Sequence, residues 1–174
     1  MKKNNIQIRP LEESDLSTTH NWINDPEISA IMGYLPVIGL ARQEKWLKDR
    51  IFSNTHYIFA ICVKKTNEHI GNIGLGDIDY VHRHASLNVF IYGKNNRGKG
   101  YGSEALEQIL EFGFLKLNLN KIYLKTSSKF EAAIGLYESK GFILEGKLRE
   151  HYYINGIYED KLLYSLLKNE YVQK

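Results

Sequence analysis

Residues 89–102 read Val-Phe-Ile-Tyr-Gly-Lys-Asn-Asn-Arg-Gly-Lys-Gly-Tyr-Gly, and they are the most informative part of the sequence. It predicts a strand, then a loop with alternating glycines, then a helix. Glycines remove the Cβ atoms that would keep a ligand away from the backbone. The N–H groups in the first turn of the helix then face the loop and favour an anion. Because Arg97 and Lys99 add positive charge, the stretch predicts a phosphate-binding site.

The strands on either side of this helix are expected to run parallel. A strand at Val89–Ile91, a helix and a second strand at Lys121–Thr126 form a crossover unit, which is right-handed in nearly all proteins. The glycine loop would therefore lie at the carboxyl end of a parallel strand pair, where α/β folds place their ligands.

The remaining elements predict one mixed α/β domain over residues 1–174. Alternating or continuous apolar runs predict strands at 6–10, 57–63, 70–75 and 85–92, and Asn155-Gly156 predicts a hairpin turn within 150–166. Helices are expected at 14–24 with Ser14-Asp15 as its N-cap, at 42–52, from Gly100 onward, and after a capping box at 128–131. Asp25-Pro26 should end the first helix, and Gly33–Gly39 should form a loop. The expected architecture is a mostly antiparallel sheet flanked by about four helices.

Composition indicates an ordinary globular protein. The chain has 174 residues, 43% hydrophobic and 25% charged, without the roughly 18 consecutive apolar residues of a membrane span. The N-terminus has no apolar run typical of a secretory signal, and the single Cys62 suits a reducing cytoplasm. The net charge is only +3, and the Lys and Arg residues are spread along the chain and not concentrated in patches, so a nucleic-acid partner is not expected.

Two familiar phosphate-binding motifs do not fit the glycine loop. A P-loop needs Gly-Lys followed by Ser or Thr, which Gly100-Tyr101-Gly102 does not supply. A dinucleotide-binding fold needs this unit near the chain start and an acidic residue after the next strand, but that strand ends Lys125-Thr126-Ser127.

The loop closely resembles the acetyl-CoA motif of the GNAT N-acetyltransferase superfamily, Gln/Arg-x-x-Gly-x-Gly/Ala, which Arg97, Gly100 and Gly102 satisfy. In that family a later helix ends in Tyr-x-x-x-Gly-Phe, and residues 137–142 read Tyr-Glu-Ser-Lys-Gly-Phe. The order of elements also resembles the family fold, and the resemblance covers nearly the whole chain. It implies a transferase that uses acetyl-CoA as co-substrate.

Within the superfamily, the chain is most similar to the branch of spermidine N-acetyltransferases and ribosomal-protein N-terminal acetyltransferases. Residues 81–85, 112–119 and 153–158 carry that similarity. Two positions depart from the branch: Phe130 stands where an Asn often contacts the cofactor, and residues 31–38 are apolar where polyamine enzymes carry an acidic cluster. The apolar loop argues against a polyamine acceptor.

The resemblance assigns the cofactor contacts. The backbone of the strand at Val89, Phe90 and Ile91 should hold the pantetheine arm as an added strand would, with Phe130 beside the cofactor. The amides of Arg97, Gly98, Lys99, Gly100, Tyr101 and Gly102 should hold the pyrophosphate.

Tyr137 is the expected general acid, with its hydroxyl facing the thioester sulfur; the alternative is a tyrosine that only packs on an apolar helix face. A phenol of pKa ~10 protonates a thiolate of pKa ~8.5 at a cost of about 2 kcal/mol, so Tyr137 should act mainly as a hydrogen-bond donor. Asp77 is the candidate base, directly or through water, and a surface turn carboxylate is the alternative. Ser86, where relatives often have a carboxylate, is not a strong base.

The predicted reaction is direct attack of a primary amine on acetyl-CoA in a ternary complex, the acceptor being a small-molecule amine or a protein N-terminus. A non-catalytic acyl-CoA-binding sensor is the alternative. His82 and His84 lack a third ligand in the sequence, so no metal is expected. The terminal hairpin's edge and Tyr152-Tyr153 favour a homo-oligomer, for example a dimer.

Overall fold

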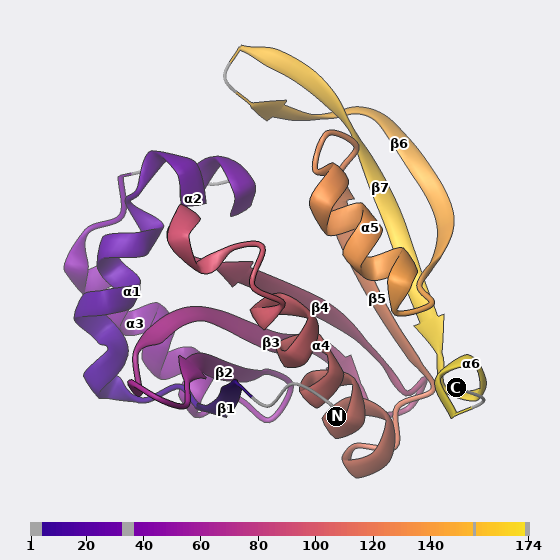
Figure 1. The fold of residues 1–174 in the computed structure, drawn as a ribbon, viewed down its shortest axis with the longest axis horizontal. Coiled ribbons are helices and arrows are strands. Elements are labelled where there is room, and N and C mark those ends of the chain that lie inside the picture. The colour runs from indigo at the N-terminus through magenta and orange to yellow at the C-terminus, as the bar shows by residue number, and fades with distance from the viewer. Residues whose placement is uncertain (1–4, 33–36, 155, 173–174) are drawn as a thin grey trace. The chain divides into compact units, whose positions relative to one another are not determined.

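A computed structural model describes residues 5–32, 37–154 and 156–172 (Figure 1). Its described strands form one seven-stranded sheet in the order β1-β2-β3-β4-β5-β7-β6. Their bounds are β1 Ile6–Pro10, β2 Tyr57–Val63, β3 His69–Asp79, β4 His84–Ile91, β5 Lys121–Ser127, β6 Ile143–Ile154 and β7 Ile157–Leu167. The strand at 57–63 has the predicted bounds, and β3 extends four residues beyond the predicted end at Leu75.

The sheet is mixed and mostly antiparallel, as predicted. Strands β1–β2, β2–β3, β5–β7 and β6–β7 pair antiparallel. The exception is β4 with β5, which run parallel, with His84–Ser86 opposite Lys121–Tyr123. The expected parallel pair therefore exists, but the pairing uses the start of β4 rather than Val89–Ile91.

The described helices are α1 Leu16–Ile23, α2 Pro26–Met32, α3 Leu40–Ile51, α4 Tyr101–Glu111, α5 Glu131–Ser139 and α6 Lys168–Val172 (Figure 1). The short helices α2 and α6 are additional to the four predicted from sequence. After α4 the chain continues through a π-helical turn at Phe112–Lys116. None of the described helices is long and apolar enough to cross a membrane.

Asp25-Pro26 ends one helix and begins the next. The Asp25 carboxylate accepts a hydrogen bond of 2.8 Å from the Glu27 N–H, while Pro26 takes the first helical position, where a missing N–H costs nothing. The predicted break after α1 is thus correct, and α2 occupies residues 26–32, for which no element was predicted. Of the predicted loop Gly33–Gly39, residues 33–36 lie outside the described residues.

One predicted helix cap is correct in position and the other is wrong. Asp15 is the N-cap residue of α1, which begins at Leu16 after a 3-10 turn, but its side chain forms no hydrogen bond to that helix. Asp15 instead forms an ion pair with Arg9 at 2.8 Å. Helix α5 begins at Glu131 with Phe130 at the N-cap, so Glu131 is the first helical residue and not the third position that a capping box requires.

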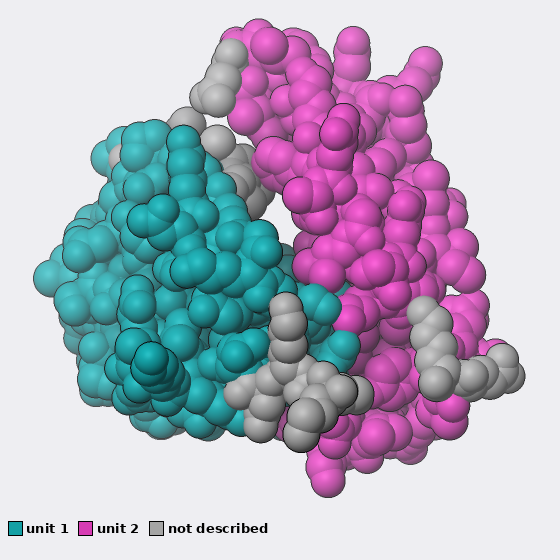
Figure 2. Space-filling view, in the orientation of Figure 1, with its two compact units in different colours: residues 1–77, 88–109 teal, residues 78–87, 110–174 magenta. Residues whose placement is uncertain are grey.

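The chain divides into two compact units, which Figure 2 shows in different colours. The first comprises residues 1–77 and 88–109, with buried apolar side chains that include Ile6, Leu47, Ile61, Ile73, Leu106 and Ile109. The second comprises residues 78–87 and 110–174, with Leu110, Phe114, Leu119, Ile122 and Leu166 buried. The expected single domain over residues 1–174 stays a prediction.

Candidate active site

The glycine loop is open where a ligand would approach. Gly98 and Gly100 have φ of +72° and +85°, a conformation that side chains disfavour, and a Cβ built on either would meet nothing within 4 Å. At Gly71, by contrast, a Cβ would lie 2.2 Å from the Phe90 carbonyl oxygen. The glycines of this loop thus give it its turn and leave space beside the backbone, which is what a bound pyrophosphate needs.

Free amides line the start of α4. Among the described residues, the N–H groups of residues 98–103 have no acceptor, whereas the Glu104 N–H donates to Gly100 O at 3.0 Å. Of the predicted amides, only that of Arg97 is already paired, with Lys94 O at 3.2 Å. Ser103 was not predicted because the motif ends at Gly102, although the rule that a helix begins with unpaired N–H groups would have included it.

The Arg97 side chain anchors the loop. Its Nε and Nη2 both donate to Ile91 O at 3.3 Å, and its Nη1 forms an ion pair with Glu27 of α2. The guanidinium therefore ties the loop to the end of β4 and to α2. Lys99 lies over the Tyr101 ring, 5.9 Å from its centre, and is exposed, so its ammonium group is accessible to a ligand at the loop.

The backbone of β4 has the alternation that the predicted pantetheine contact requires. The Tyr92 N–H donates to Ile70 O of β3 at 2.7 Å. Because successive peptide groups in a strand point to opposite edges, Val89 and Ile91 direct theirs to the other edge. The parallel register with β5 ends at Ser86, so both residues lie beyond it. An extended ligand arm can pair with this free edge of β4 as an added strand would. The Ile91 carbonyl oxygen would then accept from the ligand as well as from Arg97.

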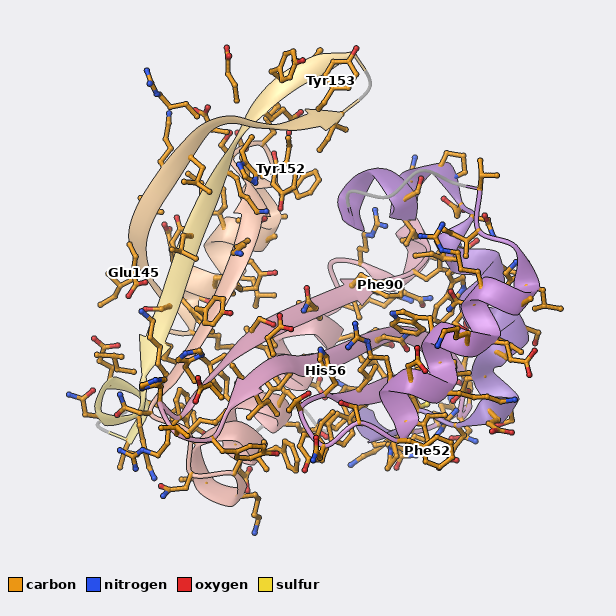
Figure 3. All side chains as sticks on the ribbon, turned by 180° about the vertical axis from the view of Figure 1, so that it is seen from behind. Phe52, His56, Phe90, Glu145, Tyr152 and Tyr153 are labelled. Atoms are coloured by element: carbon orange, nitrogen blue, oxygen red, sulfur yellow. The ribbon has the colours of Figure 1, made fainter. Side chains whose placement is uncertain are left out.

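Phe90 turns its side chain toward the N-terminal helices of its unit (Figure 3). Its ring lies edge-on to Trp22, with the ring centres 5.8 Å apart. It also lines a cavity of about 160 Å³ within the first unit, together with Ile23 and Ile28. Phe90 thus directs its carbonyl toward β3 and its side chain into a separate pocket, so it lies on the predicted cofactor strand without a backbone contact at the free edge.

Tyr137 is buried on α5. It is 8% exposed, and its ring centre lies 5.9 Å from that of Phe142. Its hydroxyl has no hydrogen-bond partner among the described residues. Burial raises the pKa of Tyr137 to about 12, so the phenol stays protonated throughout the physiological range. The Tyr137 ring therefore packs as expected, and its hydroxyl group remains available to donate a hydrogen bond to a ligand.

Asp77 lies beside His56, a residue that the sequence did not single out. Its carboxylate is 73% exposed and lies 3.5 Å from His56 Nε2, which also accepts the Asp77 N–H. Burial, and then the charge of Arg50, lower the pKa of His56, so this imidazole is neutral at pH 7. Gly71 of β3 lies beside Phe90 and Ile91 of β4. Asp77 is six residues farther along β3, which corresponds to about 20 Å from Gly71.

A buried carboxylate lies near the start of α5. The side chain of Glu159 is 9% exposed, accepts a hydrogen bond from Ser127 and lies 3.4 Å from Lys129 Nζ. Phe130 follows in the same turn, its N–H donating to Ser127 O at 3.2 Å, and no side chain caps the helix. Phe130 therefore brings only apolar surface to its predicted place beside the cofactor. The position of Glu159 near this turn could not be predicted from sequence spacing.

His82 lies in the turn between β3 and β4, and His84 is the first residue of β4. The rings of His82 and His84 are 6.4 Å apart and nearly parallel, and His84 Nε2 is 4.0 Å from an Asp79 carboxylate oxygen. The described residues contain no group of three or more His, Cys, Asp or Glu side chains placed to hold a metal ion.

The chain is similar to known acetyltransferases. Residues 5–143 match the family model of the acetyltransferase (GNAT) domain. The chain is 31% identical over 169 residues to the spermidine N(1)-acetyltransferase of Vibrio cholerae, covering 97% of this chain and 96% of that one. It is 35% identical over 101 residues to the putative ribosomal N-acetyltransferase YdaF of Bacillus subtilis, and the matched region covers 58% of this chain and 55% of YdaF.

Solved structures agree with this assignment. The Vibrio cholerae spermidine N-acetyltransferase in complex with CoA and spermine has a TM-score of 0.91 and 30% identity, covering 98% of this chain and 99% of that chain. A dodecameric structure of the spermidine N-acetyltransferase from the same organism has a TM-score of 0.84 and 29% identity, with 98% of each chain covered. The expected family and its branch are confirmed, and the chain is a member of the GNAT family of N-acetyltransferases.

Proposed function

We propose that the chain transfers the acetyl group of acetyl-CoA to a primary amine by direct attack within a ternary complex. The observation that carries this proposal is the glycine loop, where open space at Gly98 and Gly100 adjoins unpaired amides at the start of α4. This arrangement suits a pyrophosphate, and the edge of β4 beyond Ser86 suits an extended pantetheine arm.

Each part of the loop has a role in holding the coenzyme. The amides of residues 98–103 would bind pyrophosphate oxygens, and Lys99 would add a charge-assisted contact. Arg97 would hold the loop in place through Ile91 and Glu27. Bound acetyl-CoA supplies an acetyl group that is already activated as a thioester, so no cysteine nucleophile is needed.

Cys62 is a buried free thiol, which supports a reducing cytoplasm as the location.

Tyr137 would donate a hydrogen bond to the sulfur as negative charge develops there. With the Tyr137 pKa at about 12 and an ordinary thiol at ~8.5, complete proton transfer costs about 5 kcal/mol. A hydrogen bond from a buried, preorganised donor carries no such cost before the sulfur becomes charged. The raised pKa therefore supports a donor that keeps its proton until late in the reaction.

The acceptor amine must lose a proton before it attacks. An alkylammonium of pKa ~10.4 is neutral in roughly one molecule in two thousand at pH 7. Because about 20 Å of β3 separates Asp77 from the segment opposite Ile91, Asp77 would take this proton only through a chain of several waters and not by direct contact. The neutral His56 beside Asp77 is a second acceptor on the same path.

The acceptor class can be identified directly. We would incubate the protein with acetyl-CoA and separate pools of polyamines, amino sugars, amino acids and short peptides, and find the acetylated product by mass spectrometry. One pool should yield an acetylated amine. An absence of product from every pool, with acetyl-CoA shown to bind by calorimetry, would contradict the transferase.

The pH profile separates alkylamine from α-amine acceptors. Tyr137 keeps its proton below a pKa of about 12, so its donor is lost only as pH rises through that value. The rate below pH 9 therefore follows the acceptor: kcat/KM should rise about tenfold per pH unit for an alkylamine, but level off near pH 8 for a peptide N-terminus. Initial rates between pH 6 and 10 measure this. A fall in rate between pH 9 and 10 would contradict the protonated role of Tyr137.

We also propose that the chain forms homo-oligomers through the edge strand β6. Leu144 and Leu148 on this strand are 49% and 47% exposed, and exposed apolar edges are prone to pairing. Leu148→Glu is expected to lower the mass measured by light scattering toward that of the monomer. Phe52→Glu, which changes an exposed apolar side chain of the other unit, is the control. An unchanged mass for Leu148→Glu would place the interface elsewhere.

A further inference from the structure

The first unit contains a mostly apolar pocket between its N-terminal helices and the strands β3 and β4. Its apolar wall comprises Ile23, Ile28, Ile38, Trp46 and Phe90, and its volume is about 160 Å³. A cavity of roughly 150 Å³ lined by apolar side chains accommodates benzene. The pocket is therefore large enough for an aromatic ring or a branched aliphatic side chain.

A fixed hydrogen-bond donor faces this pocket. Asn72 lines it and is 8% exposed. His69 Nε2 lies 3.0 Å from Gly71 O, which can only accept, so this nitrogen carries the hydrogen and also donates to Asn72 Oδ1 at 2.8 Å. With its oxygen held by His69, Asn72 has its Nδ2 donors left for a ligand. The same contact fixes the orientation of the amide.

The side-chain amide of Gln43 also faces this pocket. Gln43 of α3 also lines the pocket, is 5% exposed, and its side chain has no hydrogen-bond partner among the described residues. Its amide atoms are not among the fully buried unpaired atoms of the described residues, so they reach the space of the pocket, where a bound carbonyl or carboxylate can accept from Nε2. Gln43 thus marks the pocket as a place for a polar group as well as an apolar one.

Charge at the pocket favours an anion over a cation. Arg42 lines the pocket and is exposed, and it forms no ion pair with a described residue. No carboxylate is among the described lining residues. A polyamine would bring several positive charges to a site that offers a guanidinium and no counter-ion, which disfavours its binding.

We infer that this pocket selects the acceptor, an α-amine with an apolar side chain and an adjacent carbonyl or carboxylate. The inference rests on the proposed acetyl transfer. The apolar side chain would fill the space beside Trp46 and Phe90, and the carbonyl or carboxylate would accept from Asn72 and Gln43. Because Phe90 lies between Val89 and Ile91, the proposed pantetheine contacts, an amine bound beside it lies next to the coenzyme strand.

Calorimetry on the protein saturated with CoA tests the pocket without turnover. The probes are L-phenylalanine, L-phenylalaninamide, a phenylalanyl dipeptide amide and spermidine. The three phenylalanine compounds share the inferred chemistry and should bind at least about tenfold more tightly than spermidine. Binding of the dipeptide amide would identify the acceptor as a peptide N-terminus. Tighter binding of the free acid, L-phenylalanine, would identify it as a small molecule. Equal or tighter binding of spermidine would overturn the inference.

Gln43→Glu tests the assignment to this pocket, because it changes an amide to a carboxylate of the same shape. L-Phenylalanine should bind at least about tenfold more weakly to this variant, since like charges would meet in the pocket. Lys45→Gln is the matched control: it makes the same change in net charge on the same helix, at a side chain that is 77% exposed and outside the pocket. Equal affinities of Gln43→Glu and Lys45→Gln would overturn the inference.

Two outcomes distinguish acceptor selection by the pocket from acetyl transfer itself. If a polyamine is acetylated and the phenylalanine compounds do not bind, acetyl transfer stands and the pocket does not select the acceptor. If the phenylalanine compounds bind as described and no amine is ever acetylated, the pocket assignment stands and the transferase does not.

Discussion

Tyr137→Phe is expected to lower kcat for acetyl transfer by about 10²–10³-fold, with little change in the affinity for acetyl-CoA. The substitution removes one buried hydroxyl that has no partner among the described residues and keeps the ring that packs on Phe142. Loss of one preorganised donor to a developing charge typically has an effect of this size. Because the bond forms only as the sulfur gains charge, kcat and kcat/KM should fall together.

Tyr164→Phe is the matched control for this prediction. Tyr164 is buried in the same unit, and its hydroxyl donates to Glu138 at 2.9 Å. Its loss should lower the free energy of unfolding by about 1 kcal/mol and leave turnover unchanged. Steady-state kinetics and denaturant unfolding of both variants separate the two effects. Full turnover by Tyr137→Phe with every accepted amine would contradict the assigned role.

Gly100→Val is expected to weaken acetyl-CoA binding by about 100-fold or more. The φ of Gly100 is +85°, so a valine there costs at least about 1–2 kcal/mol in the binding conformation. Its side chain would also occupy the open space beside the loop, where the pyrophosphate is proposed to lie. Strain and steric exclusion both act on coenzyme binding.

Gly39→Val provides the comparison. Gly39 precedes α3, and a Cβ added there also meets nothing within 4 Å, but its φ of −66° suits any residue. Calorimetric titration with acetyl-CoA should show normal affinity for this control, and circular dichroism should show that both variants are folded. Normal affinity for Gly100→Val would place the coenzyme away from this loop.

The glycine loop could be predicted from sequence because its determinants are local. Glycines at alternating positions ahead of a helix are sufficient to give positive φ, an open backbone and unpaired amides. Strand β2 was predictable for the same reason, because Tyr57–Val63 is one apolar run of strand length. The parallel pairing of β4 and β5 followed from a topological rule rather than from side chains.

Contacts between distant segments could not be predicted in this way. Arg97 was expected to face phosphate, but its partner Glu27 lies 70 residues away along the chain. His56 and Asp77, 21 residues apart, meet only because β2 and β3 pair. The side chain of Asp15 does not cap α1 for a related reason: it is held in an ion pair with Arg9, which motif spacing does not encode.

Release of free thiol from acetyl-CoA tests acetyl transfer most directly. Purified protein should release thiol only when an acceptor amine is present, and Tyr137→Phe should release it about 10²–10³-fold more slowly. Thiol release from no amine, by protein that binds acetyl-CoA in calorimetry, would contradict the account and leave a chain that holds the coenzyme without using it.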